Sequence, residues 1–158
     1  MRQANGLLQL LEEAKWEITR WAKPLGVLLE RLRKETEPLA YEAPERPDGD
    51  NLRKQLDIIE YYLGKGLIVQ AVTLARELLV SWMCLQKGDR DWLDRKSREH
   101  IEKALGAASK CLQNEPGEVP AWLYALPMSA KAAEVWRWLS QLRNDVAHCG
   151  MRKDAAPA

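Results

Sequence analysis

The spacing of apolar residues between Leu67 and Met83 constrains this chain more than any other feature. These residues recur three or four positions apart over almost five helical turns, at 67, 71, 74, 75, 78, 79, 82 and 83. In a strand the side chains of one face recur every second residue, and no convincing segment of the chain follows that period. The sequence therefore predicts an all-α fold in which this segment is a central core helix.

Similar periodicity elsewhere predicts a bundle of about five to six helices. A helix break is expected near Pro24, because proline lacks the backbone N–H and clashes with the preceding turn. Residues 36–50 and the Pro-rich stretch 114–128 are expected to be loops, the second with room for one helical turn at 121–126, and the tail 151–158 is expected to fray. A length of 158 residues favours a single domain over 1–158.

Short polar side chains mark where the helices are expected to begin. We expect the N-cap of the helix after the first loop at Asp50 or Asn51, and that of the helix after Gly88 at Asp89 or Asp91. Ser129 is the expected N-cap of the last helix. That helix is predicted to end near Gly150, which favours a left-handed C-terminal cap.

Charge and cysteine content exclude several function classes. Twenty-four Lys and Arg balance 23 Asp and Glu, so any contact with RNA must come from a local site rather than from a strongly basic surface. Three cysteines without CxxC or CxxxC spacing indicate neither a disulfide framework nor a zinc site, and they favour a reducing cytoplasm. No metal and no cofactor are predicted for this chain. No membrane span is predicted, because the longest apolar stretch, 66–83, contains Gln70, Arg76 and Glu77.

Polar groups are concentrated at the end of the last predicted helix, in the segment 142–150. Asn144 and His148 are four residues apart and share a helical face, and Arg143 flanks that surface. An imidazole can exchange a proton with an RNA 2′-hydroxyl or with the leaving oxygen, and arginine can hold the phosphate. Asn144 can orient His148 or the phosphate. One histidine cannot serve as both acid and base, so this chemistry calls for a two-fold dimer.

A purely structural interpretation of the same residues is also open. Arg and His near a helix C-terminus interact favourably with the helix dipole without any catalytic role. The chain contains a second R-x4-H spacing, from Arg95 to His100, whose intervening residues are all polar or charged. That copy is typical of a solvated helix face.

The residues between Arg143 and His148 distinguish the two copies. Arg-Asn-Asp-Val-Ala-His, followed by Gly150, resembles the R-N-x-x-A-H-x-G form of the R-x4-6-H signature of HEPN domains. The form is most similar to that of the CARF–HEPN ribonucleases, ancillary effectors of type III CRISPR systems. A Q-A-x-x-L-A-x-E pattern from Gln70 to Glu77 extends the resemblance, which spans roughly 50–152.

This resemblance implies a HEPN-like bundle and a composite site at a homodimer interface that cleaves single-stranded RNA without a metal, leaving 2′,3′-cyclic phosphate ends. His148 would act as general acid or base or would position the 2′-hydroxyl, Arg143 would bind the phosphate and Asn144 would support both. The sequence departs from the family because no CARF sensor precedes the module. Any response to a cyclic oligoadenylate activator would therefore lie outside this chain or be absent.

Three further residues are weaker candidates for substrate binding. Glu77 either faces the cleft and pairs with Arg143, or lies on the polar side of its helix. Arg152 and Lys153 extend a basic rim for RNA, or are simply solvated. Two alternatives to the ribonuclease remain open: a non-catalytic helical RNA-binding or dimerisation module, and a HEPN toxin of a toxin–antitoxin pair, for which a neighbouring nucleotidyltransferase gene would be diagnostic.

Overall fold

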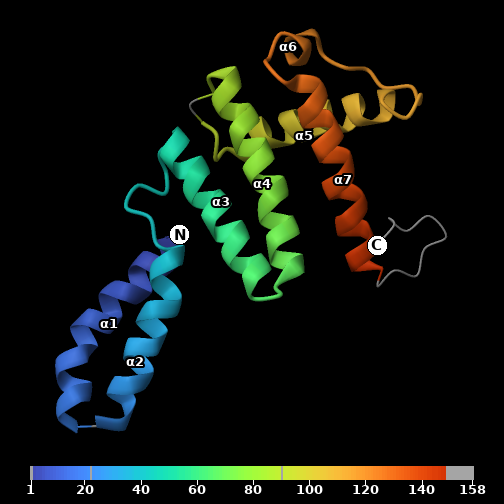
Figure 1. Ribbon diagram of the computed structural model, residues 1–158. Helices are drawn as coiled ribbons and strands as arrows, with labels where there is room; N and C mark the ends of the chain where they lie inside the picture. The colour runs from blue at the N-terminus through green and yellow to red at the C-terminus, as the bar shows by residue number, and fades with distance from the viewer. Residues whose placement is uncertain (1, 22, 90, 149–158) are drawn as a thin grey trace. The chain divides into compact units, whose positions relative to one another are not determined.

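The computed structural model describes residues 2–21, 23–89 and 91–148, and every regular element in these ranges is helical (Figure 1). The all-α prediction is confirmed. The chain divides into two compact units, residues 1–46 and 47–158, whereas the sequence predicts one domain over 1–158. The difference arises because the first two helices pack on one another as a hairpin.

The hairpin unit consists of α1 (Arg2–Trp21), α2 (Lys23–Thr36) and a 3-10 turn, η1 (Glu37–Leu39). The break between α1 and α2 falls where Pro24 predicts it. Asn5 ties the following segment to α1, because its side chain donates to the carbonyl of Tyr41 at 2.6 Å and accepts from the Tyr41 N–H at 3.1 Å. The non-helical part of the first loop is shorter than the predicted 36–50, because η1 follows α2 directly and the next helix begins at Gly49.

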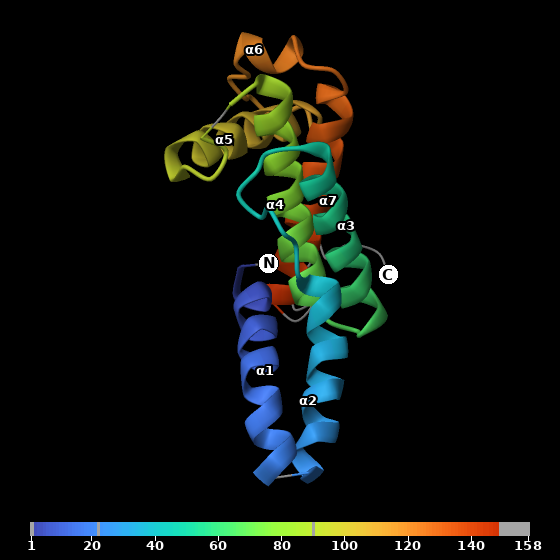
Figure 2. The same cartoon turned by 90° about the vertical axis from the view of Figure 1, so that its left-hand side faces the viewer.

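The bundle unit contains five helices: α3 (Gly49–Gly64), α4 (Ile68–Lys87), α5 (Arg95–Cys111), α6 (Ala121–Tyr124) and α7 (Ser129–Ala147). Helix α4 packs against α3, α5 and α7, and α5 runs across α4 and α7 in both views (Figures 1 and 2). The most deeply buried core residues come from α4, α5 and α6, and they include Val80, Met83, Ile101, Leu105 and Leu123.

Helix α4 is central, as predicted, but its buried side is rotated from the predicted stripe. The buried residues of α4 are Ala71, Val72, Val80, Ser81, Met83 and Cys84. The rotation arises because α4 contacts three helices rather than one. These neighbours also cover residues of α4 that lie outside the main apolar stripe. Position 76 lies four residues from both Val72 and Val80 and therefore shares their face.

By length and composition, α4 is also long and apolar enough to cross a membrane. The core helix of a globular protein meets the same criterion, and α4 supplies several core residues. The absence of a membrane span stays a prediction.

Two of the predicted N-caps are replaced by an aspartate nearby in the sequence. Asp48 caps α3 by accepting from the Asn51 N–H at 2.9 Å, and Asp94 caps α5 by accepting from the Ser97 N–H at 3.0 Å. Both have extended backbone, which the N-cap position requires. The cap predicted at Ser129 is not formed, because Ser129 is already the first residue of α7. The N-cap position is held by Met128, which has left-handed backbone and makes no side-chain capping hydrogen bond.

Candidate functional site

The predicted catalytic residues lie at the accessible C-terminal end of α7. Arg143 and His148 are exposed and Asn144 is half-buried. His148 is the C-cap of α7, and its backbone N–H donates to the Asn144 carbonyl at 2.9 Å. His148 lies five positions after Arg143, so by helical geometry their side chains leave the helix in directions about 140° apart. One copy of α7 therefore presents the cation and the imidazole on different sides.

Arg143 is two turns beyond Trp136 and shares its face of α7. Trp136 is buried, and the guanidinium carbon of Arg76, on α4, lies 4.4 Å from the centre of its indole ring. Because α4 packs against α7, the Arg76 guanidinium is held between the two helices. The structure thus brings together two arginines that are 67 positions apart in the sequence.

Arg76 lies in a partly buried setting without a direct ion-pair partner among the described residues. Its Nε is buried without a hydrogen-bond partner. Burial lowers the pKa of Arg76, and the positive charge of Arg143 lowers it further, while Glu102 and Glu77 act in the opposite direction. Within the described ranges, no carboxylate forms an ion pair with Arg76 or Arg143. Arginine stays protonated under all ordinary conditions, so Arg143 is a second positive charge close enough to act on Arg76.

Of the two arrangements expected for Glu77, pairing with Arg143 is not seen among the described ion pairs, and its side chain is instead exposed on α4. Its carboxylate accepts from Arg98 on α5 at 2.6 Å, although the Glu77 side chain remains half-exposed. The same guanidinium donates to the Ser81 hydroxyl and to the carbonyls of Trp92 and Glu77. Arg98 therefore links α5 to α4 and satisfies the carboxylate that was a candidate for substrate binding.

The second R-x4-H copy lies on an exposed face of α5, as expected. Arg95 pairs with Glu99, one turn along the helix, at 2.7 Å. His100 is exposed, and its ring lies 5.3 Å from that of Trp122. This copy provides a natural internal control for the candidate site.

The two tryptophans of α7 differ, because one lies in the core and the other is at the surface. Trp136 is buried beneath Arg76, whereas Trp138 is about half exposed and lies below the guanidinium of Arg137 at 5.3 Å. The weaker candidates Arg152 and Lys153 fall outside the described residues, as does Gly150 of the resemblance.

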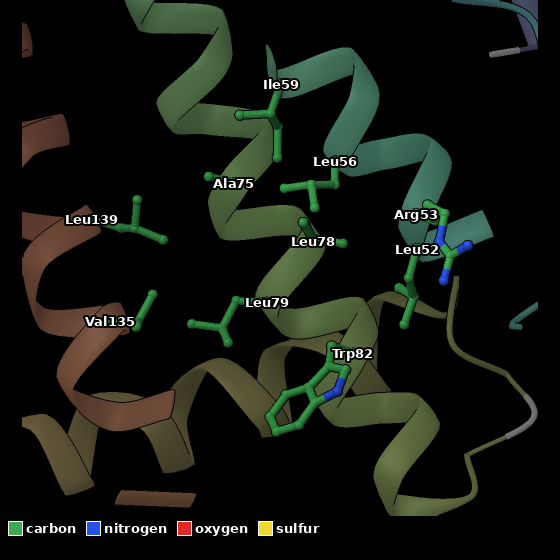
Figure 3. A pocket seen from close by; sticks show the side chains of 10 residues that line it. All are labelled: Leu52, Arg53, Leu56, Ile59, Ala75, Leu78, Leu79, Trp82, Val135 and Leu139. Atoms are coloured by element: carbon green, nitrogen blue, oxygen red, sulfur yellow. The ribbon is translucent and has the colours of Figure 1, made fainter. Parts of the chain in front are cut away.

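A separate apolar groove of about 460 Å³ lies over α4, between α3 and α7 (Figure 3). Figure 3 shows Val135 and Leu139 of α7 pointing toward α4, with Leu79 of α4 facing them. Arg53 is its single charged lining residue. Because acid–base and phosphate chemistry need several polar groups, this groove is not the candidate catalytic site.

Among the described residues, no group of three or more His, Cys, Asp or Glu side chains is arranged to hold a metal ion. Comparison with protein-family models, with curated proteins and with solved structures finds no match to this chain. The function of this chain must therefore be inferred from the chemistry and the placement of its own residues. Arg76 is the residue that the sequence does not single out, although one signal was present: it is the only Lys or Arg between Leu67 and Gln86.

Proposed function

We propose that this chain is a metal-independent endoribonuclease that cleaves single-stranded RNA at a composite site of Arg143, Asn144 and His148 across a homodimer. The observation that carries the proposal is the arrangement at the end of α7, where Arg143 has no ion-pair partner among the described residues and an exposed imidazole follows it. A structural arginine is normally saturated by acceptors, as Arg98 is here. Arg143 instead remains available to a phosphate.

A homodimer supplies what one chain lacks. Cleavage by the RNA 2′-hydroxyl needs one group to remove its proton and another to protonate the leaving oxygen. Two copies of α7 across one groove provide two imidazoles and place the His148 of one copy opposite the Arg143 of the other. This arrangement also overcomes the divergence of the two side chains on a single helix. The resemblance to CARF–HEPN ribonucleases supports a role in type III CRISPR antiviral defence, in the cytoplasm.

The deciding experiment measures cleavage of an end-labelled single-stranded RNA by the full chain in EDTA. We expect His148→Ala to lower the cleavage rate at least about 100-fold, since a general acid or base contributes that much. Arg143→Ala should cause a loss of similar order by removing a stabilising donor. His100→Ala is the matched control and should cleave at the wild-type rate. Mass spectrometry of the products should show 2′,3′-cyclic phosphate ends.

Two outcomes would overturn this assignment. A dimeric His148→Ala protein that cleaves like wild type would remove the histidine from the mechanism, and loss of cleavage in EDTA would contradict the metal-free reaction. Binding of RNA without cleavage under any condition would favour the second candidate, a non-catalytic RNA-binding module. The adjacent charges of Arg76 and Arg143 favour that second candidate too, because they bind phosphate without any need for an imidazole.

A further inference from the structure

Arg76 on α4 combines partial burial with an unpartnered polar atom. It lies on the same face of α4 as two buried valines, stacks on a buried tryptophan and has a buried Nε that no acceptor satisfies. Removing a charged group from water without a partner is costly, so each such group needs an explanation. The indole provides part of it, because a guanidinium over an aromatic face is attracted to the ring.

The terminal nitrogens of Arg76 provide the rest of the explanation. They make no hydrogen bond within the described residues, and they are not among the buried atoms that lack a partner, so they reach solvent. Contact with the Trp136 ring restrains the guanidinium, which leaves its terminal N–H donors available to a ligand. The planar fork of a guanidinium matches two oxygens of a phosphate group.

Arg98 shows how the same fold treats an arginine whose role is structural. Its guanidinium donates to four acceptors on α4 and on the segment before α5. Arg76, by contrast, has no acceptor and has Arg143, a second cation, close enough to lower its pKa. Glu102 and Glu77 act on Arg76 from a distance without pairing with it, and an anionic ligand bound by Arg76 and Arg143 would further relieve the repulsion between the two cations.

We infer that Arg76 is a second phosphate-binding residue, which holds the backbone of single-stranded RNA beside the phosphate bound by Arg143. The inference rests on the proposed function for the identity of the ligand, and it adds a residue of α4 to a site otherwise built from α7. Because a phosphate contact positions the strand without reading its bases, Arg76 contributes affinity that is independent of sequence. Its loss should raise KM with little change in kcat.

The test measures binding of a fluorescein-labelled single-stranded RNA by anisotropy over a series of salt concentrations. The full chain carries His148→Ala so that the RNA stays intact. Arg76→Gln should weaken binding about tenfold, as expected for one charge-assisted contact. It should also reduce the magnitude of the slope of log K against log salt by about 0.7, the value for one phosphate contact on a single strand.

Arg137→Gln is the matched control. Arg137 also lies over a tryptophan and also has a buried, unpartnered Nε, but it leaves α7 about 120° away from Arg143. Arg137→Gln should retain the RNA affinity and the salt slope of the chain that carries only His148→Ala. Single-stranded DNA of the same sequence should lose affinity by the same factor as RNA on Arg76→Gln, because both carry the phosphate.

Equal affinity and equal salt slope for Arg76→Gln and Arg137→Gln would overturn the inference. If Arg76→Gln does not fold, Arg76→Lys decides, because it keeps the charge but loses the planar fork. An approximately threefold weaker affinity is expected for it, and an unchanged affinity refutes the inference. Failure of the two proposals is distinguishable: a wild-type chain without cleavage activity refutes the ribonuclease, while loss of RNA binding in Arg76→Gln still supports the phosphate contact.

Discussion

Replacing Arg98 by methionine is expected to destabilise the bundle unit strongly. The Arg98 side chain is only 15% exposed, and it bonds Glu77 through both the carboxylate, at 2.6 Å, and the backbone carbonyl, at 3.1 Å. It also donates to Ser81 and to the Trp92 carbonyl, at 3.2 and 3.0 Å. Methionine keeps the apolar stem but removes every donor, so these acceptors lose their partner.

The magnitude follows from the number and setting of these bonds. A hydrogen bond to a charged group contributes about 1.5–3 kcal/mol, but neighbouring bonds do not add, and solvent screens the half-exposed carboxylate of Glu77. Arg98→Met should therefore lower the free energy of unfolding by about 2–4 kcal/mol. At a denaturant slope of about 2 kcal/mol/M, the urea midpoint should fall by roughly 1–2 M.

Urea unfolding followed by far-UV circular dichroism measures this change. Arg95→Met on the same helix is the control, because Arg95 is 90% exposed in its pair with Glu99 and should cost at most about 0.5 kcal/mol. A loss for Arg98→Met within about 0.5 kcal/mol of the control would refute the argument that Arg98 joins the two helices. Glu77→Gln should leave RNA cleavage intact, which separates this structural role from substrate binding.

Two further predictions concern packing and a buried thiol. Gly117→Ala should destabilise the protein by about 1–3 kcal/mol, because the added Cβ would lie 2.5 Å from the Ala107 carbonyl oxygen. Gly106→Ala, within α5, brings the added Cβ near no atom of another element and should stabilise the protein by about 0.5–1 kcal/mol. Thermal unfolding of both variants checks the two signs. Burial raises the pKa of the Cys84 thiol, so with the other cysteines replaced by serine it should resist a thiol reagent until unfolding. Since the folded pKa lies above the unfolded one, the contribution of Cys84 to stability is complete below about pH 8.5 and declines as the pH rises further. Rapid labelling of the native protein near neutral pH would contradict this.

The sequence alone predicts much of the local structure. Apolar spacing predicts the helices, and Pro24 and the Pro-rich segments predict where they stop, because these signals depend on hydrogen bonds and backbone angles within a few residues. The N-caps are harder, since several aspartates near a boundary all suit the role. The sequence also places the Arg143 and His148 motif near the end of the last helix, where the structure leaves both side chains exposed.

Only the tertiary structure decides what each helix face meets. A helix turns by about 100° per residue, so a small rotation of α4 determines whether position 76 faces solvent or Trp136. The partners of Arg76 and Glu77 lie on other helices, and no local pattern specifies which side chains meet across those contacts. The motif itself is therefore readable from the sequence, whereas the second cation beside it and the arginine that engages Glu77 depend on how α4, α5 and α7 pack together.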